Sequence, residues 1–571
     1  MSLTALINFH RKDSVEKLEA WYTQGDLIAE GGRMSMQTPF AAEIPAKTRR
    51  VVDPLLPQDS VYRLVGNEID QILKDEEFLD LYAAEGRPAV NPVVLALVSV
   101  FQFLEKLPDR AAAEAAMMRL DWKYALRQEL TWTGFHYSDL CNFRKRLLAH
   151  EREWVVFERL VAYLRERGYI QERGKQRTDS TKIIGLVARL SRLELVWEAI
   201  RATLQALEDA DVSWVRKQLP VSFVENYGQR RWDFRLSKTE IRRRMSEAGQ
   251  EGYWLLDQVE AHGSDELKAL AEVKQLRRVL EEQFNRGDDG EPTPRPSGQA
   301  KGDVITTPHD PEARYGYKGG QGWVGYKLQI TETAGEVSRF ITDIEIVPAM
   351  RQDNQCLTAI QDRLVQRGIL PGKQYVDQAY MSGRHIAESL AKGIDLRGYV
   401  REGNTNRLQG FRLQDFQIDV EQRQAICPAG KKQVKWVRAK PGVKNLIAYH
   451  VSFGTQCQSC PYYGPDRCTD KQTGRHLGVN AHHNLIQARR QEADSEAFKE
   501  EMQIRGGIEG TISEMVRSHG LRRSRYRGRR KNQLQVLFVA AATNLKRLAL
   551  HFLVSVLPKG QPEYLNGVRA A

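Results

Sequence analysis

The chain has 571 residues, of which 41% are hydrophobic and 28% are charged, and this balance excludes wholesale disorder. Lysine and arginine number 85 against 73 acidic residues, so the formal net charge is +12. Six cysteines are too few for a disulfide scaffold of this length, and the sequence does not begin with the pattern of a secretory leader. Residues 536–557 form the longest apolar tract, but it is interrupted by Asn544, Lys546, Arg547 and His551, so we expect a buried helix there instead of a membrane span. We expect an intracellular, soluble protein of about three or four structural units.

The first 170 residues divide into two parts. Residues 1–58 have a mixed composition with four prolines, which is typical of an extended N-terminal arm. In residues 59–170 apolar side chains recur three and four positions apart, and this spacing predicts an all-helical N-terminal domain.

Residues 171–571 alternate short strand-type runs with helical stretches, which predicts an α/β layer. Two insertions interrupt this pattern. The first, residues 186–300, is helical and ends in a linker rich in glycine and proline, and its function does not follow from the sequence. The second, residues 403–480, carries four of the six cysteines.

Two segments between the insertions have the alternation of a β-hairpin, residues 323–331 and 340–348. In the first, Tyr326, Leu328 and Ile330 share one face, while Lys327, Gln329 and Thr331 share the other. Trp323 and Tyr326 have lysine neighbours and are candidates for base stacking, but an aromatic side chain in a hairpin is more often part of the core. We therefore expect core positions.

Three carboxylates stand at positions where an α/β protein gathers ligands. Asp179 lies in a strand-type segment, Asp377 at the end of another, and Glu509 in a late helical stretch. Two divalent cations about 3.5–4 Å apart can activate a water molecule or a 3′-hydroxyl and stabilise the leaving oxygen of a phosphodiester. Magnesium prefers oxygen ligands and keeps several waters, so a few carboxylates suffice. Three acids among 73 do not define such a site by spacing alone.

Several segments of the sequence resemble those of a known protein family. Over residues 60–550 the sequence resembles bacterial insertion-sequence transposases of the DDE type, in particular the insertion-sequence family numbered 1182. The matching segments are RTDSTKI, TPHDPEARYGYKGGQGWVGYKLQIT, YVDQAYMSG and RGGIEGTISEMVRSHGLRRSRYRGRRKNQLQ. The fold class that this implies is α/β, with a ribonuclease-H-like catalytic core that carries helical and zinc-bearing insertions and follows the all-helical domain.

The resemblance also implies a mechanism. Asp179, Asp377 and Glu509 fall on the three catalytic positions, which would hold two Mg²⁺ or Mn²⁺ ions. The enzyme would bind the terminal inverted repeats of an insertion sequence, hydrolyse the element ends, and join the 3′-hydroxyls to target DNA without a covalent protein–DNA intermediate. Pairing two ends implies a homodimer or a higher assembly on double-stranded DNA, and the all-helical domain of residues 59–170 would serve DNA binding or dimerisation. The expected location is the bacterial cytoplasm, associated with the nucleoid.

Helical geometry favours Glu509 over Glu514 as the third acid. Five residues at 100° each leave the two side chains about 140° apart, so both cannot point at one metal pair. Arg505 precedes Glu509 by one turn and shares its face, where it is expected to pair with the carboxylate or with a DNA phosphate. Related transposases carry a Tyr–Arg–Glu–Lys signature here, but Met502 replaces the tyrosine and Val516 the lysine.

A basic cluster follows this helix and contains no acidic residue. Such a cluster repels itself unless a polyanion neutralises it, so we expect contacts with DNA phosphates, the alternative being a solvated basic loop. With Arg505, the expected DNA-binding residues are Arg517, Arg522, Arg523, Arg525, Arg527, Arg529, Arg530 and Lys531.

The second insertion has the composition of a zinc module. Cys457 and Cys460 form a CxxC pair, with Cys427 and Cys468 as the further thiols and His450 as a possible substitute for one of them. Four thiolates hold Zn²⁺ tetrahedrally and staple a small loop-rich segment, so we expect one structural Zn²⁺. Unligated reduced cysteines and a redox CxxC are the alternatives. The remaining two cysteines are expected in the core.

Two other functions remain open. A related metal-dependent nuclease without strand transfer would use the same carboxylates. An inactive or domesticated descendant would bind DNA through the basic cluster, with no metal-dependent chemistry. No Walker-type phosphate loop is present, which disfavours an ATP-driven mechanism.

Overall fold

The computed structural model describes residues 34–36, 38–187, 189–228, 236–287, 290–296, 303–335, 339–401, 410–440 and 447–556. Of the predicted N-terminal arm, residues 1–33 and 37 lie outside the described residues. Residues Ala46–Val52 form a helix with buried Thr48 and Val52, so this part of the arm is not extended. The chain divides into two compact units, Met1–Arg159 and Leu160–Ala571. No helix of the described residues is long and apolar enough to cross a membrane.

The first unit is built from helices around one central apolar helix. Twelve of the 13 residues of that helix, α4, are buried, and it begins where the Asn91 side chain accepts hydrogen bonds from the N–H groups of Val93 and Val94. A two-residue parallel bridge joins β1 (Met34–Ser35) to β2 (Arg87–Pro88). The helices are α2 (Ala46–Val52), α3 (Val61–Ile72), α4 (Pro92–Leu104), α5 (Asp109–Met118), α6 (Leu120–Ala125), α7 (Ser138–Ala149) and α8 (Val155–Glu166), which crosses into the second unit.

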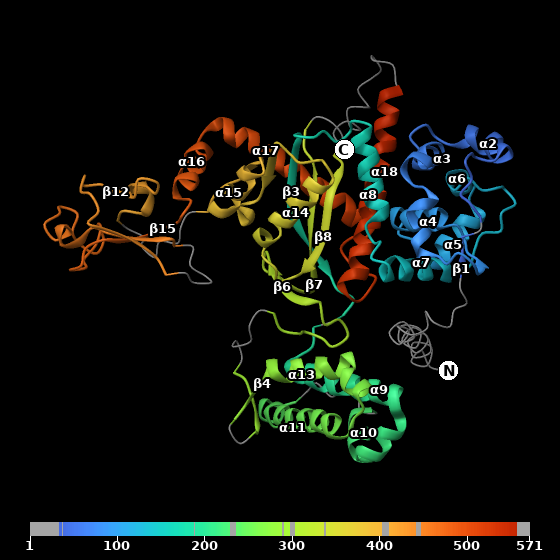
Figure 1. The fold of residues 1–571 in the computed structure, drawn as a ribbon, viewed down its shortest axis with the longest axis horizontal. Helices are drawn as coiled ribbons and strands as arrows, with labels where there is room; N and C mark the ends of the chain where they lie inside the picture. Colours follow the sequence, from blue (N-terminus) through green and yellow to red (C-terminus); the bar gives the residue numbers. More distant parts are fainter. Residues whose placement is uncertain are drawn as a thin grey trace. The chain divides into compact units, whose positions relative to one another are not determined.

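The second unit contains a six-stranded mixed sheet (Figure 1). Its order is β10-β9-β3-β7-β6, and β8 pairs with β7. β3 runs parallel to β9 and antiparallel to β7, and β7 and β8 form the predicted antiparallel pair. The strands are β3 (Lys175–Ile184), β6 (Arg314–Lys318), β7 (Gln321–Thr333), β8 (Ile341–Pro348), β9 (Lys373–Val376) and β10 (Asp395–Arg397).

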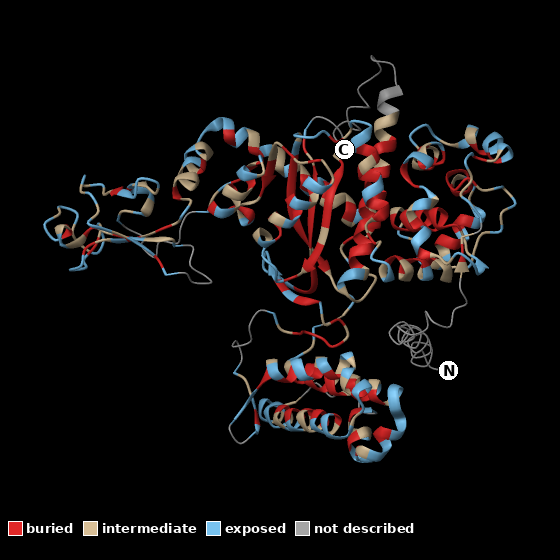
Figure 2. Ribbon diagram, viewed as in Figure 1, coloured by how far each residue is buried: buried red, intermediate tan, exposed pale blue. Residues whose placement is uncertain are grey.

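Side chains on both faces of β7 are buried (Figure 2). Trp323 and Tyr326 are core residues, as expected. Gln329 and Thr331, which the alternation placed on a polar face, are also fully buried. Their polar groups form hydrogen bonds inside the protein: the Gln329 amide donates to the Asp353 carboxylate, and the Thr331 hydroxyl bonds the Thr178 hydroxyl.

Helices pack against this sheet and cover its free edge. Asn544 and Gln533 of the long helix α18 exchange hydrogen bonds with the backbone N–H and C=O groups of β8, at Ile341 and at Ile344 and Ile346. Side-chain amides thereby replace the missing neighbour strand. The helices are α14 (Leu357–Gln366), α15 (Gly383–Ala391), α16 (His483–Ala493), α17 (Glu496–His519) and α18 (Arg529–Val556).

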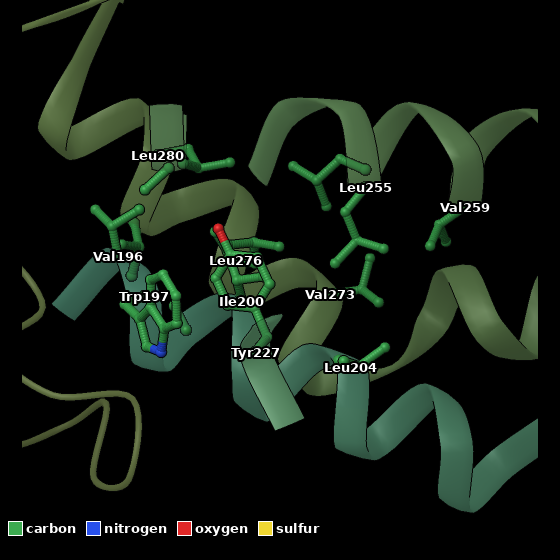
Figure 3. Close-up of a cluster of buried hydrophobic side chains, with 14 of the residues drawn as sticks. Val196, Trp197, Ile200, Leu204, Tyr227, Leu255, Val259, Val273, Leu276 and Leu280 are labelled. Atoms are coloured by element: carbon green, nitrogen blue, oxygen red, sulfur yellow. The ribbon is translucent and has the colours of Figure 1, made fainter. Parts of the chain in front are cut away.

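The first insertion forms a helical module with its own core (Figure 3). Val196, Ile200 and Leu204 of one helix pack with Leu276 and Leu280 of another. The elements are α9 (Arg192–Gln218), α10 (Val221–Gly228), α11 (Lys238–His262), α12 (Asp265–Ala269) and α13 (Ala271–Gln283), followed by the hairpin of β4 (Phe284–Arg286) and β5 (Pro292–Pro294).

The second insertion is a small β module. It has one hairpin and one three-stranded antiparallel sheet of order β13-β14-β15, which share a compact core that includes Val451 and Leu477. The strands are β11 (Gln417–Asp419), β12 (Gln424–Ile426), β13 (Lys435–Arg438), β14 (Tyr449–Ser452) and β15 (His476–Val479).

Candidate active site

Asp179 lies in the middle of β3. Its side chain is 11% exposed, and its Oδ1 accepts a hydrogen bond of 2.7 Å from the backbone N–H of Ser180. Burial raises the pKa of Asp179 above its usual value, although the Ser180 N–H and the charges of Arg505 and Lys318 act in the opposite direction. Asp179 is therefore a carboxylate held in one orientation away from bulk solvent.

Asp377 follows β9 immediately. Thr178 of β3 is paired with Val376 of β9, so the next residue along each of these parallel strands, Asp179 and Asp377, come side by side. The Asp377 side chain accepts a hydrogen bond of 2.7 Å from the N–H of Gln378, which begins a short 3₁₀ turn. It is 47% exposed and therefore accessible from solvent.

Helix α17 brings the third carboxylate and a cation to the same place. Arg505 Nη2 lies 2.7 Å from Asp179 Oδ2 and 4.0 Å from Asp377 Oδ2. Arg505 Nη1 lies 4.0 Å from Glu509 Oε1, one helical turn further on. The carboxylates of a strand, a strand end and a helix thus converge on one guanidinium, which offsets their mutual repulsion.

Glu514 points away from this group. Its carboxylate lies 2.8 Å from Arg547 Nη2 and 3.1 Å from Lys546 Nζ, both on α18. Burial acts to raise the pKa of Glu514, but these two cations outweigh it and lower the pKa. Glu509 and Glu514 thus face different partners, in agreement with the helical spacing.

A buried ion pair fixes α17 against the sheet. Arg177 of β3 lies 2.6 Å from Glu332 of β7, which is fully buried, and also donates a hydrogen bond of 2.6 Å to the carbonyl of Ile504 in α17. The guanidinium lies so close to the helix that a Cβ on Gly507 would be 2.1 Å from Arg177 Nη1. Gly507 thus permits a contact that sets the position of Arg505 and Glu509.

Sequence reasoning did not assign Arg177 or Lys318 to the site. Lys318 ends β6, and its Nζ lies 3.3 Å from the carbonyl of Ser180, so its charge acts on Asp179. Arg177 could have been found from the sequence, because it stands two positions before Asp179 in the same strand, and alternation places the two side chains on one face. Lys318 had no such signal, because only the β6–β7 pairing brings it near.

The basic cluster begins where α17 ends. Gly520 adopts a left-handed conformation that stops the helix, and the following residues run along the end of β3. Arg522 has an internal role, because it donates to the Thr181 hydroxyl at 2.9 Å and to the Lys182 carbonyl at 2.7 Å. The exposed members of the cluster are Arg517, in the last turn of α17, and Arg523, Arg529 and Arg530.

All four cysteines of the β module line one small cavity of about 20 Å³. The sulfurs of Cys427 and Cys457 accept hydrogen bonds of 3.4 Å from the backbone N–H groups of Lys431 and Arg475. Burial raises the pKa of the Cys468 thiol, and the three other cysteines raise it further. The sequence suggested His450 as a substitute for one of these thiols, but this was wrong. His450 is exposed on the outer face of β14 and does not line the cavity.

In the described residues, no group of three or more His, Cys, Asp or Glu side chains is close enough, as the side chains stand, to hold a metal ion. The residue types of the two clusters are nevertheless those that bind two kinds of metal ion. The three carboxylates lie around the Arg505 guanidinium, and their oxygens are the hard ligands that a divalent cation such as Mg²⁺ prefers. The thiols share one cavity, as a soft tetrahedral site requires.

A mixed α/β unit with convergent carboxylates is the kind of fold and site used by metal-dependent enzymes that act on phosphodiesters. Two family models match the chain, the Transposase DDE domain over residues 426–549 and the Transposase domain (DUF772) over residues 50–146. Together these matches indicate a DDE-type transposase family, whose members act on DNA and generally use divalent metal ions. The first match includes Glu509 and the four clustered cysteines, whereas Asp179 and Asp377 precede it. Neither the curated proteins nor the solved structures gave a significant match.

Proposed function

We propose that this protein is a DNA transposase of the insertion-sequence family numbered 1182, with a ribonuclease-H-like core in residues 171–571. It binds the terminal inverted repeats of its element, cleaves the ends by metal-dependent hydrolysis, and joins the 3′-hydroxyls to target DNA. The convergence of Asp179, Asp377 and Glu509 on the Arg505 guanidinium carries this proposal. Its place of action is the bacterial nucleoid, because its substrate is DNA.

The three carboxylates would hold two Mg²⁺ or Mn²⁺ ions. When bound, the ions supply an activated water or 3′-hydroxyl and stabilise the leaving oxygen. The chain itself contributes orientation: Ser180 and Gln378 fix the carboxylates of Asp179 and Asp377 through backbone N–H groups. Glu509 is 73% exposed, so it can meet a ligand that arrives from solvent.

Arg505 has two consequences for this site. Without a metal, its guanidinium balances the charge of the carboxylates. If the carboxylates held metal ions, they would no longer need the guanidinium for charge balance, and Arg505 would be available to pair with a DNA phosphate. The exposed arginines of the basic cluster, which are Arg517, Arg523, Arg529 and Arg530, would extend that contact along the backbone of the duplex.

The β module would carry one structural Zn²⁺ on Cys427, Cys457, Cys460 and Cys468. The shared cavity and the two N–H···S hydrogen bonds support this proposal, because zinc-bound sulfur is negatively charged and accepts such bonds. A module with so small a core gains stability from a metal staple.

The N-terminal helical unit would bind DNA or dimerise, and we propose a dimer or larger assembly on paired element ends.

The experiment that tests the function is processing of DNA that contains the flanking ends of the gene, with Mg²⁺ or Mn²⁺, scored for nicks and for joined products. We compare wild type with Asp377→Asn, and we use Asp362→Asn as the control because Asp362 is a half-exposed carboxylate that pairs only with Lys392 among the described residues.

The expected result is end-specific cleavage and joining in wild type and in the control variant, and loss of both with Asp377→Asn while DNA binding is retained. Cleavage without joining would identify a nuclease. Duplex binding with no metal-dependent product would identify an inactive DNA-binding descendant. Cleavage that survives Asp377→Asn would refute the assignment of the active site.

A further inference from the structure

The β module has an uneven distribution of charge that the proposed function does not use. Residues 422–465 contain seven lysines and arginines and no aspartate or glutamate. Four of these cations lie on or beside the edge strand β13 and are exposed. They are Lys432, Lys435, Arg438 and Lys440, and none makes an ion pair within the described residues.

The three-stranded sheet of this module has one apolar and one polar face. Trp436, Val451 and Leu477 are paired across the strands on the inner face, where Val451 and Leu477 are buried in the module core. On the outer face, Lys435 of β13 is aligned through Ser452 of β14 with His476 of β15. His450 of β14 is paired with Val437 of β13, two residues further along that strand. The side chains of Lys435, His450 and His476 are exposed.

Like charges on and beside one strand repel one another, and within the described residues no ion pair compensates these four cations. Strand residues rise about 3.3 Å each, so the eight steps from Lys432 to Lys440 span at most about 26 Å. A duplex presents a phosphate charge for every ~1.7 Å of its axis, so a row of this length can face phosphates over most of one helical turn.

We infer that the outer face and edge of β13 form a second DNA-binding surface, which contacts the phosphate backbone of duplex DNA separately from the arginine cluster after α17. The choice of DNA as the polyanion rests on the proposed function. The surface itself rests on charge complementarity, with Lys435 and Arg438 exposed on the edge strand β13, Lys432 and Lys440 exposed beside its two ends, and no acid in residues 422–465.

The test is salt-dependent binding of a labelled duplex to the full-length protein, in the presence of EDTA so that no chemistry occurs. One variant changes Lys432, Lys435, Arg438 and Lys440 to glutamine. The matched control removes four exposed cations of the helical module that form no ion pair within the described residues, by changing Arg216, Lys217, Lys238 and Lys274 to glutamine. Thermal unfolding and zinc content of both variants are compared with wild type to verify folding.

Each phosphate contact contributes about 0.9 to the slope of log K against log salt, so the module variant should lose about 2–4 from that slope and at least tenfold in affinity. The control should change the slope by less than 1. In addition, bound duplex should protect Lys432, Lys435 and Lys440 from acetylation, measured by mass spectrometry, and should leave Lys217 and Lys238 reactive.

An unchanged slope in the module variant, or an equal loss in both variants, would overturn the inference. So would a variant that binds duplex normally and loses binding only to phosphatidylserine vesicles. These outcomes are separate from the proposed function: wild type that processes element ends while the module variant binds normally refutes only this surface. A module-dependent salt slope without metal-dependent products refutes only the catalytic function.

Discussion

The two adjacent glycines of α17 give opposite predictions for the same substitution. An added Cβ at Gly506 meets nothing within 4 Å, whereas at Gly507 it would be 2.1 Å from Arg177 Nη1. Replacing a helical glycine by alanine stabilises a helix by about 0.5–1 kcal/mol, so Gly506→Ala should stabilise α17 by that amount.

Gly507→Ala should instead destabilise the helix. Arg177 cannot yield freely, because its side chain is 5% exposed and is bonded to Glu332 and to the Ile504 carbonyl. Losing a hydrogen bond to a charged group costs about 1.5–3 kcal/mol, and separating a buried pair costs about 3–5 kcal/mol. After subtraction of the helix gain, we expect the free energy of unfolding of α17 to fall by about 0.5–4.5 kcal/mol.

Amide hydrogen exchange along α17 measures this difference locally, which suits a chain of several units. We expect exchange a few times slower than wild type in Gly506→Ala, and at least about twofold faster in Gly507→Ala, since 1.4 kcal/mol corresponds to a factor of ten. Processing of element ends should fall in Gly507→Ala alone, because Arg505 and Glu509 move with the helix. Equal protection in the two variants would refute the argument that Arg177 holds this helix.

Three further predictions concern charge and metal. Arg505→Gln should bind Mn²⁺ about tenfold more tightly, because removing a unit positive charge a few Å from a divalent ion in water is worth about 1–2 kcal/mol. Electron paramagnetic resonance of free Mn²⁺ measures the dissociation constant, and unchanged or weaker binding would contradict the prediction. Zinc should be present at about one ion per chain and be lost with Cys457→Ser but not with Cys141→Ser, and its chelation should expose residues 410–480 to protease while α17 stays protected; protein isolated without zinc would argue against the staple. Burial acts to raise the pKa of Glu198, but hydrogen bonds from His309 and Arg201 outweigh it and lower the pKa to about 2. The stability from this group is therefore complete above pH ~4.5 and is lost as pH falls toward ~2, by about 3 kcal/mol at most, and Glu198→Gln should flatten that part of the pH dependence of thermal unfolding.

Local pattern was sufficient to locate several elements. Alternation predicted the β7–β8 pair, which the structure contains. The apolar tract interrupted by Asn544 and Arg547 indicated a buried helix, and α18 is one. The 3.6-residue period separated Glu509 from Glu514, and the two side chains do face different partners. These features depend on neighbours along the chain, so periodicity carries them.

Other features required the assembled fold. Alternation placed Gln329 and Thr331 on a polar face, but helices and neighbouring strands bury them, and internal hydrogen bonds make that burial possible. Asn544 was visible in the sequence only as a break in an apolar tract, whereas its amide pairs with the edge of β8. His450, a reserve zinc ligand by spacing, is turned outward by the register of β14.

The sequence by itself determined which residue types are available and on which kind of element each lies, with Asp179 in a strand, Asp377 after one and Glu509 in a helix. Only the tertiary structure decided that β3 and β9 run parallel in a register that aligns the two aspartates. It also decided that Arg177 holds α17 where Arg505 reaches both aspartates and Glu509. The physical reason is that strand register and helix docking are set by pairings between residues more than 100 positions apart, and a local pattern carries no information about those pairings.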